Sequence, residues 1–412
     1  MQSDVILCEH LPPLQRSLRV AVVTETYPPE VNGVANTVVR FVEGLRALNH
    51  EIQLIRPRQV RDDGALAGPR HELLVRGIAL PKYPGLQMGL PARSLLTHVW
   101  ARRRPDVVHV VTEGPLGWSA IRAASRLKIP VTSDFRTNFD AYSSYYGMGW
   151  LRKPIGAYLR KFHNRTLITT APTVSLRREL LDIGYRNVQV VARGVDTTLF
   201  NPARRSEELR RSWGVAAKEP VIGYVGRLAP EKNLPLLLTA FREIRKRHDR
   251  ARLVLVGDGP LGAELGRDPH VVRAGVRSGE DLAAHYASFD FFLFPSVTET
   301  FGNVTVEAMA SGLALVAYGY AAAAEHIEDG VSGLLADYGD ERHFTEQALR
   351  LVADPKLAAE LRAAARSAAE KIDWACVVKA MEAVLFAAAE ATGVRHAAVR
   401  LPVRSRPQRA NS

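Results

Sequence analysis

The first half of the chain alternates between continuous apolar runs and stretches with helical periodicity. Residues 18–23 are apolar except at Arg19, which is typical of a strand buried on both faces of a sheet. Apolar residues then recur at helical spacing, at Val38, Phe41, Val42, Leu45 and Leu48. Further strand-like runs occur at 51–55, 106–111, 131–135 and 188–191. Strands separated by helices predict βαβ units and a parallel sheet.

The second half repeats this pattern after residue 202. Strands are predicted at 221–226, 253–257, 271–272, 291–294 and 313–317, and a helix at 234–245. We therefore predict an α/β protein with two Rossmann-like domains, joined near residues 195–202, whose parallel sheets face each other across a cleft. The predicted segments are a leader at 1–17, a first domain at 18–196, a second domain at 197–371, and a basic disordered tail at 391–412.

The composition is that of an ordinary globular protein. Of 412 residues, 47% are hydrophobic and 24% are charged, which excludes a wholly disordered chain. Two cysteines exclude a disulfide scaffold and a cysteine-built zinc site, which fits a reduced cytoplasmic setting. The net charge of +12 attracts phosphate in any form, whether nucleotide, nucleic acid or anionic lipid.

Neither a secretory signal nor a membrane-spanning helix is predicted. Residues 1–17 contain acids and two prolines and lack a basic start. The longest uncharged run, 308–324, is shorter than the roughly 20 apolar residues that a spanning helix needs. We expect a cytoplasmic protein that contacts the inner face of the cytoplasmic membrane only peripherally.

Three loops that follow predicted strands contain candidate binding residues. The first, at 27–34, contains Asn32 and Gly33 and leads into a helix. Glycine lets a ligand approach the backbone, and a helix start offers free N–H groups to phosphate. A plain turn between a strand and a helix explains this segment equally well.

The second loop, at 226–233, reads GRLAPEKN. Arg227 and Lys232 are expected at the carboxyl end of a strand and beside the start of a helix. Two cations in this place suit a diphosphate. The alternative is a pair of solvated surface charges.

The third loop, at 295–307, carries Glu299 and Glu307, separated by seven residues. A helix predicted over 304–309 places Glu299 in the loop before it and Glu307 about one turn inside it. Carboxylates accept hydrogen bonds from sugar hydroxyls, and backbone N–H groups at a helix start face phosphate, here those of Gly302, Asn303 and Val304. The alternative is a surface loop with a capping acid.

Together these motifs resemble the retaining GT-B glycosyltransferases of family 4. The resemblance rests on the E-x7-E pair, on Arg227 and Lys232, on the segment RGVDTTLFNP at 193–202, and on GDGP at 257–260. It extends over roughly residues 18–390. The segment FRTNFD at 135–140 is similar to a subgroup that includes α-mannosyltransferases, diacylglycerol glucosyltransferases and sulfolipid synthases.

The resemblance implies transfer of a hexose from a UDP- or GDP-linked sugar to a lipid or glycan acceptor, with retention of anomeric configuration and without metal or cofactor. It assigns catalytic contacts to Arg227, Lys232 and Glu299. Glu307 matches the residue that holds the ribose hydroxyls, and Glu299 the residue that contacts the donor sugar. The implied donor site also includes Gly33, Asn32, Gly257, Gly302, Asn303 and Val304. In this fold a helix at 372–390 packs back on the first domain.

One position departs from the family pattern. Many members carry a histidine near the end of the strand that reads VVTE at 110–113, and none stands at Val111 or Thr112. His109 is nearby, but strand alternation turns it to the other face from Val110, where a packed histidine is expected. Related subgroups have histidine where this chain has Arg136. Glu113 and Arg136 are therefore the candidates for the missing catalytic contact.

A basic stretch at 150–165 indicates how an acceptor is reached. It mixes five Lys and Arg residues with Trp150, Tyr158 and Phe162, a combination that can sit on an anionic membrane surface. The alternative is an ordinary helix whose charges face water. We expect a lipid acceptor at the membrane surface, with a soluble sugar acceptor as the alternative.

Other classes of protein share parts of this pattern. A GT-B nucleotide-sugar epimerase or phosphorylase would share the fold, but neither explains Arg227, Lys232, Glu299 and Glu307 together. A basic nucleic-acid-binding protein would share the charge, but no zinc-finger or RNA-motif signature accompanies it, so nucleic acid is not an expected partner. The nucleotide base, the sugar, the acceptor linkage and the oligomeric state stay open at this point.

Overall fold

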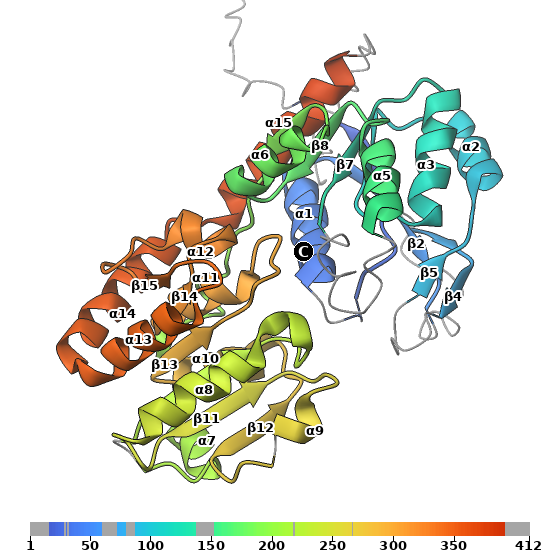
Figure 1. The fold of residues 1–412 in the computed structure, drawn as a ribbon. Helices are drawn as coiled ribbons and strands as arrows, with labels where there is room; N and C mark the ends of the chain where they lie inside the picture. Colours follow the sequence, from blue (N-terminus) through green and yellow to red (C-terminus); the bar gives the residue numbers. More distant parts are fainter. Residues whose placement is uncertain are drawn as a thin grey trace, which may run out of the picture.

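The chain folds into two α/β domains that lie side by side, as the computed structural model shows (Figure 1). The structure describes residues 16–28, 30, 33–59, 72–79, 87–136, 152–216, 219–265 and 267–391. Asn32, Trp150, nearly all of the predicted leader and all but the first residue of the predicted tail lie outside these ranges. The two predicted Rossmann-like domains with parallel sheets are confirmed.

The N-terminal domain is built on a seven-stranded parallel sheet with the order β3-β2-β1-β6-β7-β8-β9. Its strands are β1 (Arg19–Val23), β2 (Glu51–Pro57), β3 (Glu72–Val75), β6 (Val107–Val110), β7 (Val131–Asp134), β8 (Ile168–Ala171) and β9 (Val188–Val190). A separate antiparallel pair consists of β4 (Gly77–Ala79) and β5 (Gln87–Gly89). The helices are α1 (Gly33–Ala47), α2 (Arg93–Arg102), α3 (Pro115–Arg126), α5 (Arg152–His163) and α6 (Val174–Asp182).

The C-terminal domain is built on a six-stranded parallel sheet with the order β12-β11-β10-β13-β14-β15. Its strands are β10 (Val221–Val225), β11 (Arg252–Val256), β12 (Val271–Gly275), β13 (Phe291–Phe294), β14 (Ala314–Tyr318) and β15 (Leu334–Ala336). The helical segments are η3 (Pro202–Arg204), α7 (Glu207–Ser212), η4 (Pro230–Lys232), α8 (Leu234–Arg245), α9 (Gly262–Leu265), α10 (Gly279–Ser288), α11 (Asn303–Ala310), α12 (Ala321–His326), α13 (Glu341–Ala353) and α14 (Pro355–Ala369).

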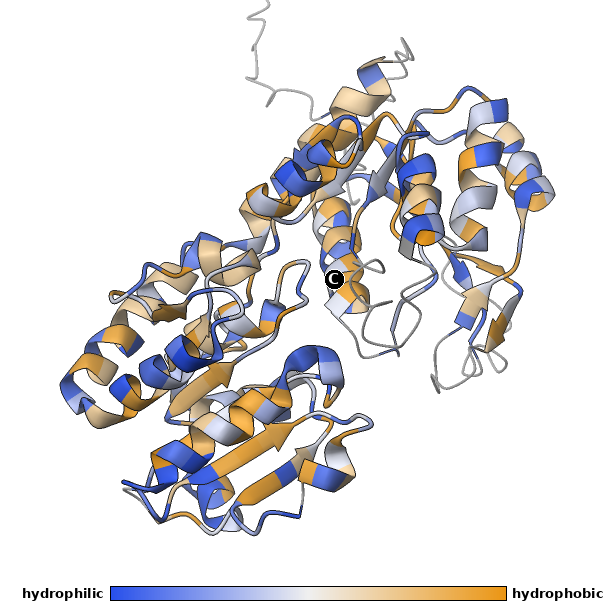
Figure 2. Cartoon of the chain, viewed as in Figure 1, coloured by the Kyte–Doolittle hydropathy of each residue, from blue (hydrophilic) through white to orange (hydrophobic). Residues whose placement is uncertain are grey.

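Figure 2 shows hydrophobic residues along strands of the sheets, and in both domains strand residues form hydrophobic cores with residues of the neighbouring helices. Every residue of β6 and of β13 is buried, as the continuous apolar runs predict. In the N-terminal domain one core lies between the sheet and α1, and a second core lies between the sheet and the pair α2 and α3. Among the described residues, no helix is both long and apolar enough to cross a membrane.

The last helix, α15 (Trp374–Ala391), runs back from the C-terminal domain and packs on α1 (Figure 1). The Trp374 ring meets the edge of Phe41 at 5.9 Å between centroids. A Cβ at Gly44 would lie 2.5 Å from a methyl group of Val378, so this close approach of the two helices requires glycine there. The helix thereby ties both domains together.

Candidate active site

The site is built where two helix N-termini meet across the domains. Gly33 is the first residue of α1 and Asn303 the first residue of α11, and a Cβ at Gly33 would lie 3.2 Å from the Asn303 side-chain nitrogen. Gly302 caps α11 in a left-handed conformation, with φ +92°, which favours glycine. The first N–H groups of both helices lack intrahelical acceptors, and both helix dipoles present their positive ends here. This arrangement favours an anion.

Two cations from the loop after β10 lie on the C-terminal side of the cleft. Lys232 ends η4 and its ammonium group contacts the carboxylate of Glu299. Glu299 also accepts a hydrogen bond of 2.7 Å from the Ser296 hydroxyl. Arg227 is 38% exposed, and its guanidinium lies 3.8 Å from the Glu231 carboxylate. The structure thus brings Lys232 and Glu299 together, while the Arg227 side chain is partly exposed.

Glu307 lies one turn inside α11, as predicted. The Tyr286 hydroxyl donates a hydrogen bond of 2.9 Å to the Glu307 carboxylate. Burial raises the pKa of Glu307 to about 7, and the bond from Tyr286 partly offsets that rise. A carboxylate that titrates near neutral pH can accept hydrogen bonds from a ligand's hydroxyl groups once it is ionised.

The glycines after β10 and β11 have a packing role. A Cβ at Gly257 would lie 2.0 Å from the carbonyl oxygen of Gly226, so the two strand ends can approach only without a side chain. Gly257 also has a φ of +132°. Backbone geometry therefore accounts for Gly257 without a ligand contact.

Two carboxylates in the loops after β1 and β6 are partly or fully buried, those of Glu25 and Glu113. Glu113 is buried, and its carboxylate lies 3.4 Å from His163 Nε2. Glu25 accepts a hydrogen bond of 3.0 Å from the Leu116 N–H at the start of α3. Burial raises the pKa of Glu25 to about 7, and the nearby Glu113 adds to the rise.

Two family models match the chain, one in each domain. The model described as Glycosyltransferase Family 4 matches residues 31–199, and the model described as Glycosyl transferases group 1 matches residues 219–354. The GDP-mannose-dependent alpha-mannosyltransferase of Corynebacterium glutamicum is 34% identical over 364 residues, which cover 87% of this chain and 86% of that protein. The chain belongs to glycosyltransferase family 4.

More distant relatives support the same family and the same fold. The alpha-monoglucosyldiacylglycerol synthase of Streptococcus pneumoniae is 26% identical over 339 residues, covering 78% of this chain and 76% of that protein. The solved sucrose-phosphate synthase of Thermosynechococcus elongatus has a TM-score of 0.75 at 19% identity, with coverage of 90% of this chain and 100% of that one, and so supports the fold. The epimerase and phosphorylase alternatives gain no support from these relatives.

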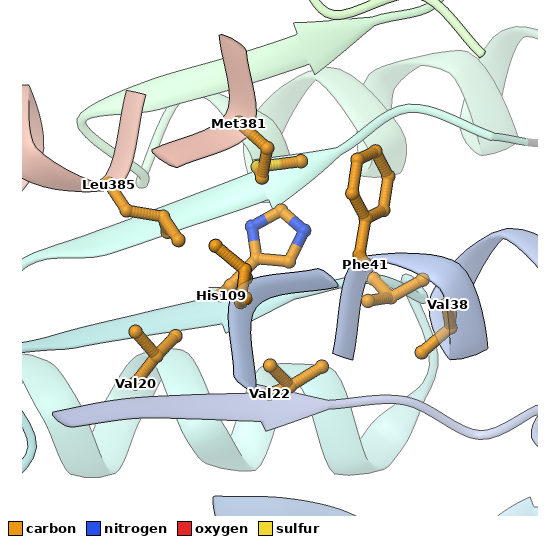
Figure 3. A pocket seen from close by; sticks show the side chains of 9 residues that line it. Val20, Val22, Val38, Phe41, His109, Met381 and Leu385 are labelled. Atoms are coloured by element: carbon orange, nitrogen blue, oxygen red, sulfur yellow. The ribbon is translucent and has the colours of Figure 1, made fainter. Parts of the chain in front are cut away.

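The glycosyltransferase buries His109 within its N-terminal domain, as strand alternation predicts. Figure 3 shows its ring in a small pocket among Val20, Val22, Phe41, Met381 and Leu385. His109 Nδ1 lies 2.9 Å from the Thr132 hydroxyl, and Nε2 lies 3.9 Å from a carboxylate oxygen of Asp134. Burial lowers the pKa of His109 to about 4, so the ring is neutral at physiological pH.

Arg136 of the glycosyltransferase lies at the junction of the domains. Its backbone carbonyl accepts a hydrogen bond of 3.0 Å from the Thr300 hydroxyl, in the loop that carries Glu299. Its buried side chain contacts the carboxylate of Asp134, at the end of β7. The segment that follows β9 is tied to α1 by the 2.6 Å ion pair of Arg40 with Asp196.

Several residues of this region were not predicted from the sequence as site residues. No sequence pattern singles out Glu25, whose pKa is raised mainly by burial and further by the charge of Glu113. Tyr286 and Ser296 orient the two predicted glutamates. From the sequence, Arg193 is only the first residue of the segment 193–202. In the structure its guanidinium lies 3.4 Å from the Asn303 side-chain oxygen. Within the described ranges, no group of three or more His, Cys, Asp or Glu side chains could hold a metal ion.

The structure corrects one part of the predicted membrane patch. Phe162, expected as an aromatic anchor, is fully buried and packs on Trp118 with 5.2 Å between ring centroids. Tyr158 donates a hydrogen bond of 2.5 Å to the carbonyl oxygen of Glu113. These aromatic residues hold α5 on the sheet, because the helix needs an apolar face to pack against the domain core. Lys153, Arg160 and Lys161 are exposed, as predicted.

Proposed function

We propose that this glycosyltransferase moves a hexose from a nucleoside diphosphate sugar to a lipid or glycan acceptor, with retention of anomeric configuration and without a metal ion. The observation that carries the proposal is the convergence of the N-termini of α1 and α11 next to the loop in which Glu299 contacts Lys232. These groups supply positive charge and N–H donors at one place, which a diphosphate requires.

The proposed donor site assigns a role to each predicted side chain. Arg227 and Lys232 stabilise the charge that develops on the leaving diphosphate. Glu307 accepts hydrogen bonds from the ribose hydroxyls, and Glu299 from the transferred sugar. Since Lys232 and Glu299 contact each other, the donor inserts between groups that are already neutralised and held in place.

Retention is proposed to follow from a front-face reaction. The bond from the anomeric carbon to the diphosphate oxygen breaks, and a bond to the acceptor oxygen forms on the same face of the sugar. The acceptor hydroxyl gives its proton to the departing phosphate oxygen. The protein's contribution is to hold both reactants and to stabilise the diphosphate charge, so this route needs no protein nucleophile.

GDP-mannose is the first donor to test, because the relative from Corynebacterium glutamicum is named as GDP-mannose-dependent. The experiment measures binding of UDP- and GDP-sugars by calorimetry, followed by mass analysis of products formed in lipid extracts. An NMR assignment of the new anomeric centre tests retention. Failure to bind any nucleoside diphosphate sugar, or an inverted anomeric centre, would contradict the proposal.

The acceptor is proposed to be lipid-linked and reached at an anionic membrane surface. The helices α2, α3 and α5 lie side by side on the N-terminal domain (Figure 1) and contain no Asp or Glu, whereas each contains at least two Lys or Arg residues. Arg93, Arg122, Arg126 and Arg165 line a groove of about 470 Å³ on this face. Each cation near an anionic surface contributes about 1 kcal/mol to docking.

Vesicle co-sedimentation tests this docking face. The charge reversal Lys153→Glu, Arg160→Glu and Lys161→Glu should release the protein from anionic vesicles, as should high salt. The matched control reverses three exposed cations of the C-terminal domain, Arg211→Glu, Lys356→Glu and Lys371→Glu, and should leave binding largely intact. Equal loss in both triple variants would show that only the net charge matters and would remove this face from the proposal.

A further inference from the structure

A groove between the domains lies beside the proposed donor site. It has a volume of about 290 Å³ and is lined by α6 of the N-terminal domain and by the loops after β13, β14 and β15 of the C-terminal domain. The start of α6 meets α12 at this place, where the Val174 N–H contacts the Glu325 carboxylate (Figure 1). The lining residues include Ser175, Glu179, Thr298, Glu299, Tyr320 and Tyr338.

The sheet topology separates this groove from the proposed diphosphate contacts. In the C-terminal sheet β13 lies between β10 and β14, and β15 lies beyond β14. Arg227 and Lys232 follow β10. Tyr320 follows β14, and Tyr338 follows β15. Since Glu299 is in the loop after β13, the groove extends from Glu299 away from the two cations.

Tyr338 contributes an exposed aromatic ring whose orientation is fixed. The residue is 59% exposed, yet its hydroxyl donates a hydrogen bond of 2.8 Å to the Val297 carbonyl oxygen. Tyr320 packs against it edge to face, with 4.9 Å between ring centroids. A ring that is exposed and already oriented offers the C–H groups of a ligand an apolar surface at little cost in conformational entropy.

Hydrogen-bonding groups line the groove on α6. Ser175 and Glu179 are four residues apart, so they lie on one face of the helix, and both are exposed. The Glu179 carboxylate makes no ion pair or hydrogen bond with the described residues. The Ser175 hydroxyl donates a hydrogen bond of 3.2 Å to the Thr173 hydroxyl, so its oxygen can still accept one. Both side chains can therefore accept hydrogen bonds from the hydroxyl groups of a ligand.

The groove differs in charge from the proposed diphosphate site. None of the described residues that line it is Lys, Arg or His. Glu299 is paired with Lys232, whereas the charge of Glu179 is not balanced by a described residue and would repel an anion. The volume is at the lower end of ligand pockets, which begin at about 300 Å³, and suits one sugar ring. An apolar ring, hydroxyl acceptors and the lack of a cation together favour a neutral sugar.

We propose that this groove binds a neutral sugar ring of the acceptor, beside the sugar that Glu299 holds for transfer. The ring stacks on Tyr338, and its hydroxyl groups donate hydrogen bonds to Glu179 and Ser175. The inference rests on the proposed glycosyl transfer and specifies an acceptor that already carries a neutral sugar. The acceptor is the expected source because the groove lies on the other side of Glu299 from the proposed diphosphate contacts.

Binding measurements on the full chain test the subsite directly. The protein is first mixed with GDP or UDP, whichever binds more tightly. The methyl α-glycosides of mannose, glucose and galactose are then titrated by NMR, with glucuronate as the charged probe. At least one neutral glycoside should bind roughly fivefold more tightly than glucuronate. Binding of none of the three, or binding of glucuronate as tight as that of the best neutral probe, would overturn the inference.

Glu179→Ala is the decisive variant, because this exposed helix position has no described side-chain partner and alanine favours the helix. It should lower affinity for the best neutral probe roughly fivefold, the usual effect of losing a hydrogen bond, while nucleoside diphosphate affinity stays within twofold. Glu179→Lys should abolish the discrimination against glucuronate. The matched control is Glu360→Ala, an exposed acid in α14, which should change neither affinity. Unchanged binding of the neutral probe by Glu179→Ala would overturn the inference.

Two substitutions of Tyr338 separate its ring from its hydroxyl. Tyr338→Phe keeps the ring and loses the bond to Val297, so it should retain most of the affinity for the neutral probe. Tyr338→Ala removes the ring and should lose at least fivefold. Equal loss in both variants would assign the effect to the loop rather than to stacking and would overturn the inference. If Tyr338→Ala fails to fold, the comparison of Glu179→Ala with Glu360→Ala decides.

Kinetics distinguish failure of the inference from failure of the proposed function. With a neutral glycosylated lipid as acceptor, Glu179→Ala should raise the acceptor KM and leave the donor KM unchanged. If transfer proceeds and the acceptor KM does not change, the inference fails and the proposed function stands. If the neutral probes bind through Glu179 but no nucleotide sugar is ever used, the proposed function fails and the groove stands as a sugar-binding site.

Discussion

The charged side chains on the two sides of the domain junction differ in their partners. On the C-terminal side, charged groups have partners of their own: Lys232 contacts Glu299, and Glu307 accepts a hydrogen bond from Tyr286. On the N-terminal side, Arg136 and Arg193 are buried, and among the described residues Asp134 is the carboxylate that contacts Arg136, while burial raises the pKa of Glu25 as it does that of Glu307. The first side is organised by an ion pair and a hydrogen bond between neighbouring side chains, whereas on the second side the buried Arg136 faces the carboxylates of Asp134 and Glu113.

The pairing of charged side chains affects how much each side must rearrange when a ligand binds. Paired groups keep their geometry without ligand, so the donor side can bind a diphosphate with little rearrangement. Unbalanced buried charge lowers stability and is retained where function needs it. Substitutions on the proposed donor side should therefore reduce function without a gain in stability.

The largest expected effect concerns Lys232. Lys232→Ala removes a cation from the proposed diphosphate site and leaves Glu299 without its ion pair, which adds repulsion toward the donor. A charge-assisted contact of this kind is worth about 2 kcal/mol, so donor binding or turnover should fall roughly thirtyfold. Steady-state kinetics with nucleotide sugar measure the loss. Lys246→Ala, which removes an exposed ion pair with Glu243, is the control, and equal effects in both variants would refute the site.

A smaller effect is expected at the meeting point of the two helices. Gly33→Val places methyl groups against the Asn303 amide, where a Cβ alone would already lie at 3.2 Å. The N-termini of α1 and α11 must then move apart, and nucleoside diphosphate affinity should fall about tenfold because they bind phosphate jointly. Calorimetry measures this change, and unaltered affinity would separate α1 from the donor site.

Gly156→Ala is the matched control for that glycine substitution. Gly156 lies inside α5, and a Cβ there would meet no atom within 4 Å. Alanine has the higher helix propensity, so this variant should gain up to about 1 kcal/mol in free energy of unfolding with unchanged nucleotide affinity. Comparing the two variants distinguishes Gly33, which allows the two helix N-termini to approach closely, from Gly156, whose only effect is to lower helix stability.

The donor side should also respond to pH through Glu307. Its pKa of about 7 in the folded protein lies above the ordinary value of 4.5, so the protonated form is favoured by folding. The associated stability is fully present below about pH 4.5 and is lost as pH rises through 7. Binding of ribose hydroxyls favours the ionised form, so nucleotide affinity should rise about fivefold between pH 6 and pH 8.

Glu307→Gln isolates this titration from that of Glu25, whose pKa is also about 7. The variant should bind nucleotide more weakly and without the rise in affinity between pH 6 and pH 8. If its affinity follows the same pH curve as the parent, the titration belongs to another group, and Glu25→Gln becomes the next variant to measure.

The proposed donor side could be predicted from the sequence because its residues lie close together in local motifs. Arg227, Lys232, Glu299 and Glu307 stand in loops directly after strands, and the ends of parallel strands share one edge of a sheet. Most strands of the two parallel sheets were predicted from their apolar runs, but the edge strands β3 and β15 were not predicted. β8 was missed because its residues, Ile168–Ala171, include two threonines, which are buried in the sheet where a purely apolar run was expected.

The N-terminal side could not be predicted in the same way. Arg193 and Arg136 are far apart in sequence, and their burial depends on how the two domains pack on each other. The raised pKa of Glu25 depends on burial beneath the start of α3, which no local pattern shows. Phe162 was misplaced on the surface because the spacing of aromatic and basic residues in α5 does not reveal which face meets the core.

The smallest expected effect is that of removing divalent metal. If the positive charge of Arg227, Lys232 and the two helix N-termini suffices for the diphosphate, transfer should be unchanged in EDTA and after added manganese. The measurement is initial rate with saturating nucleotide sugar, before and after chelation. Activity lost in EDTA and regained with manganese would mean that a metal ion neutralises the leaving diphosphate. In that case Lys232→Ala should lower donor binding or turnover by far less than thirtyfold, because the metal ion would neutralise most of the diphosphate charge. The chelation experiment and the lysine variant therefore test each other.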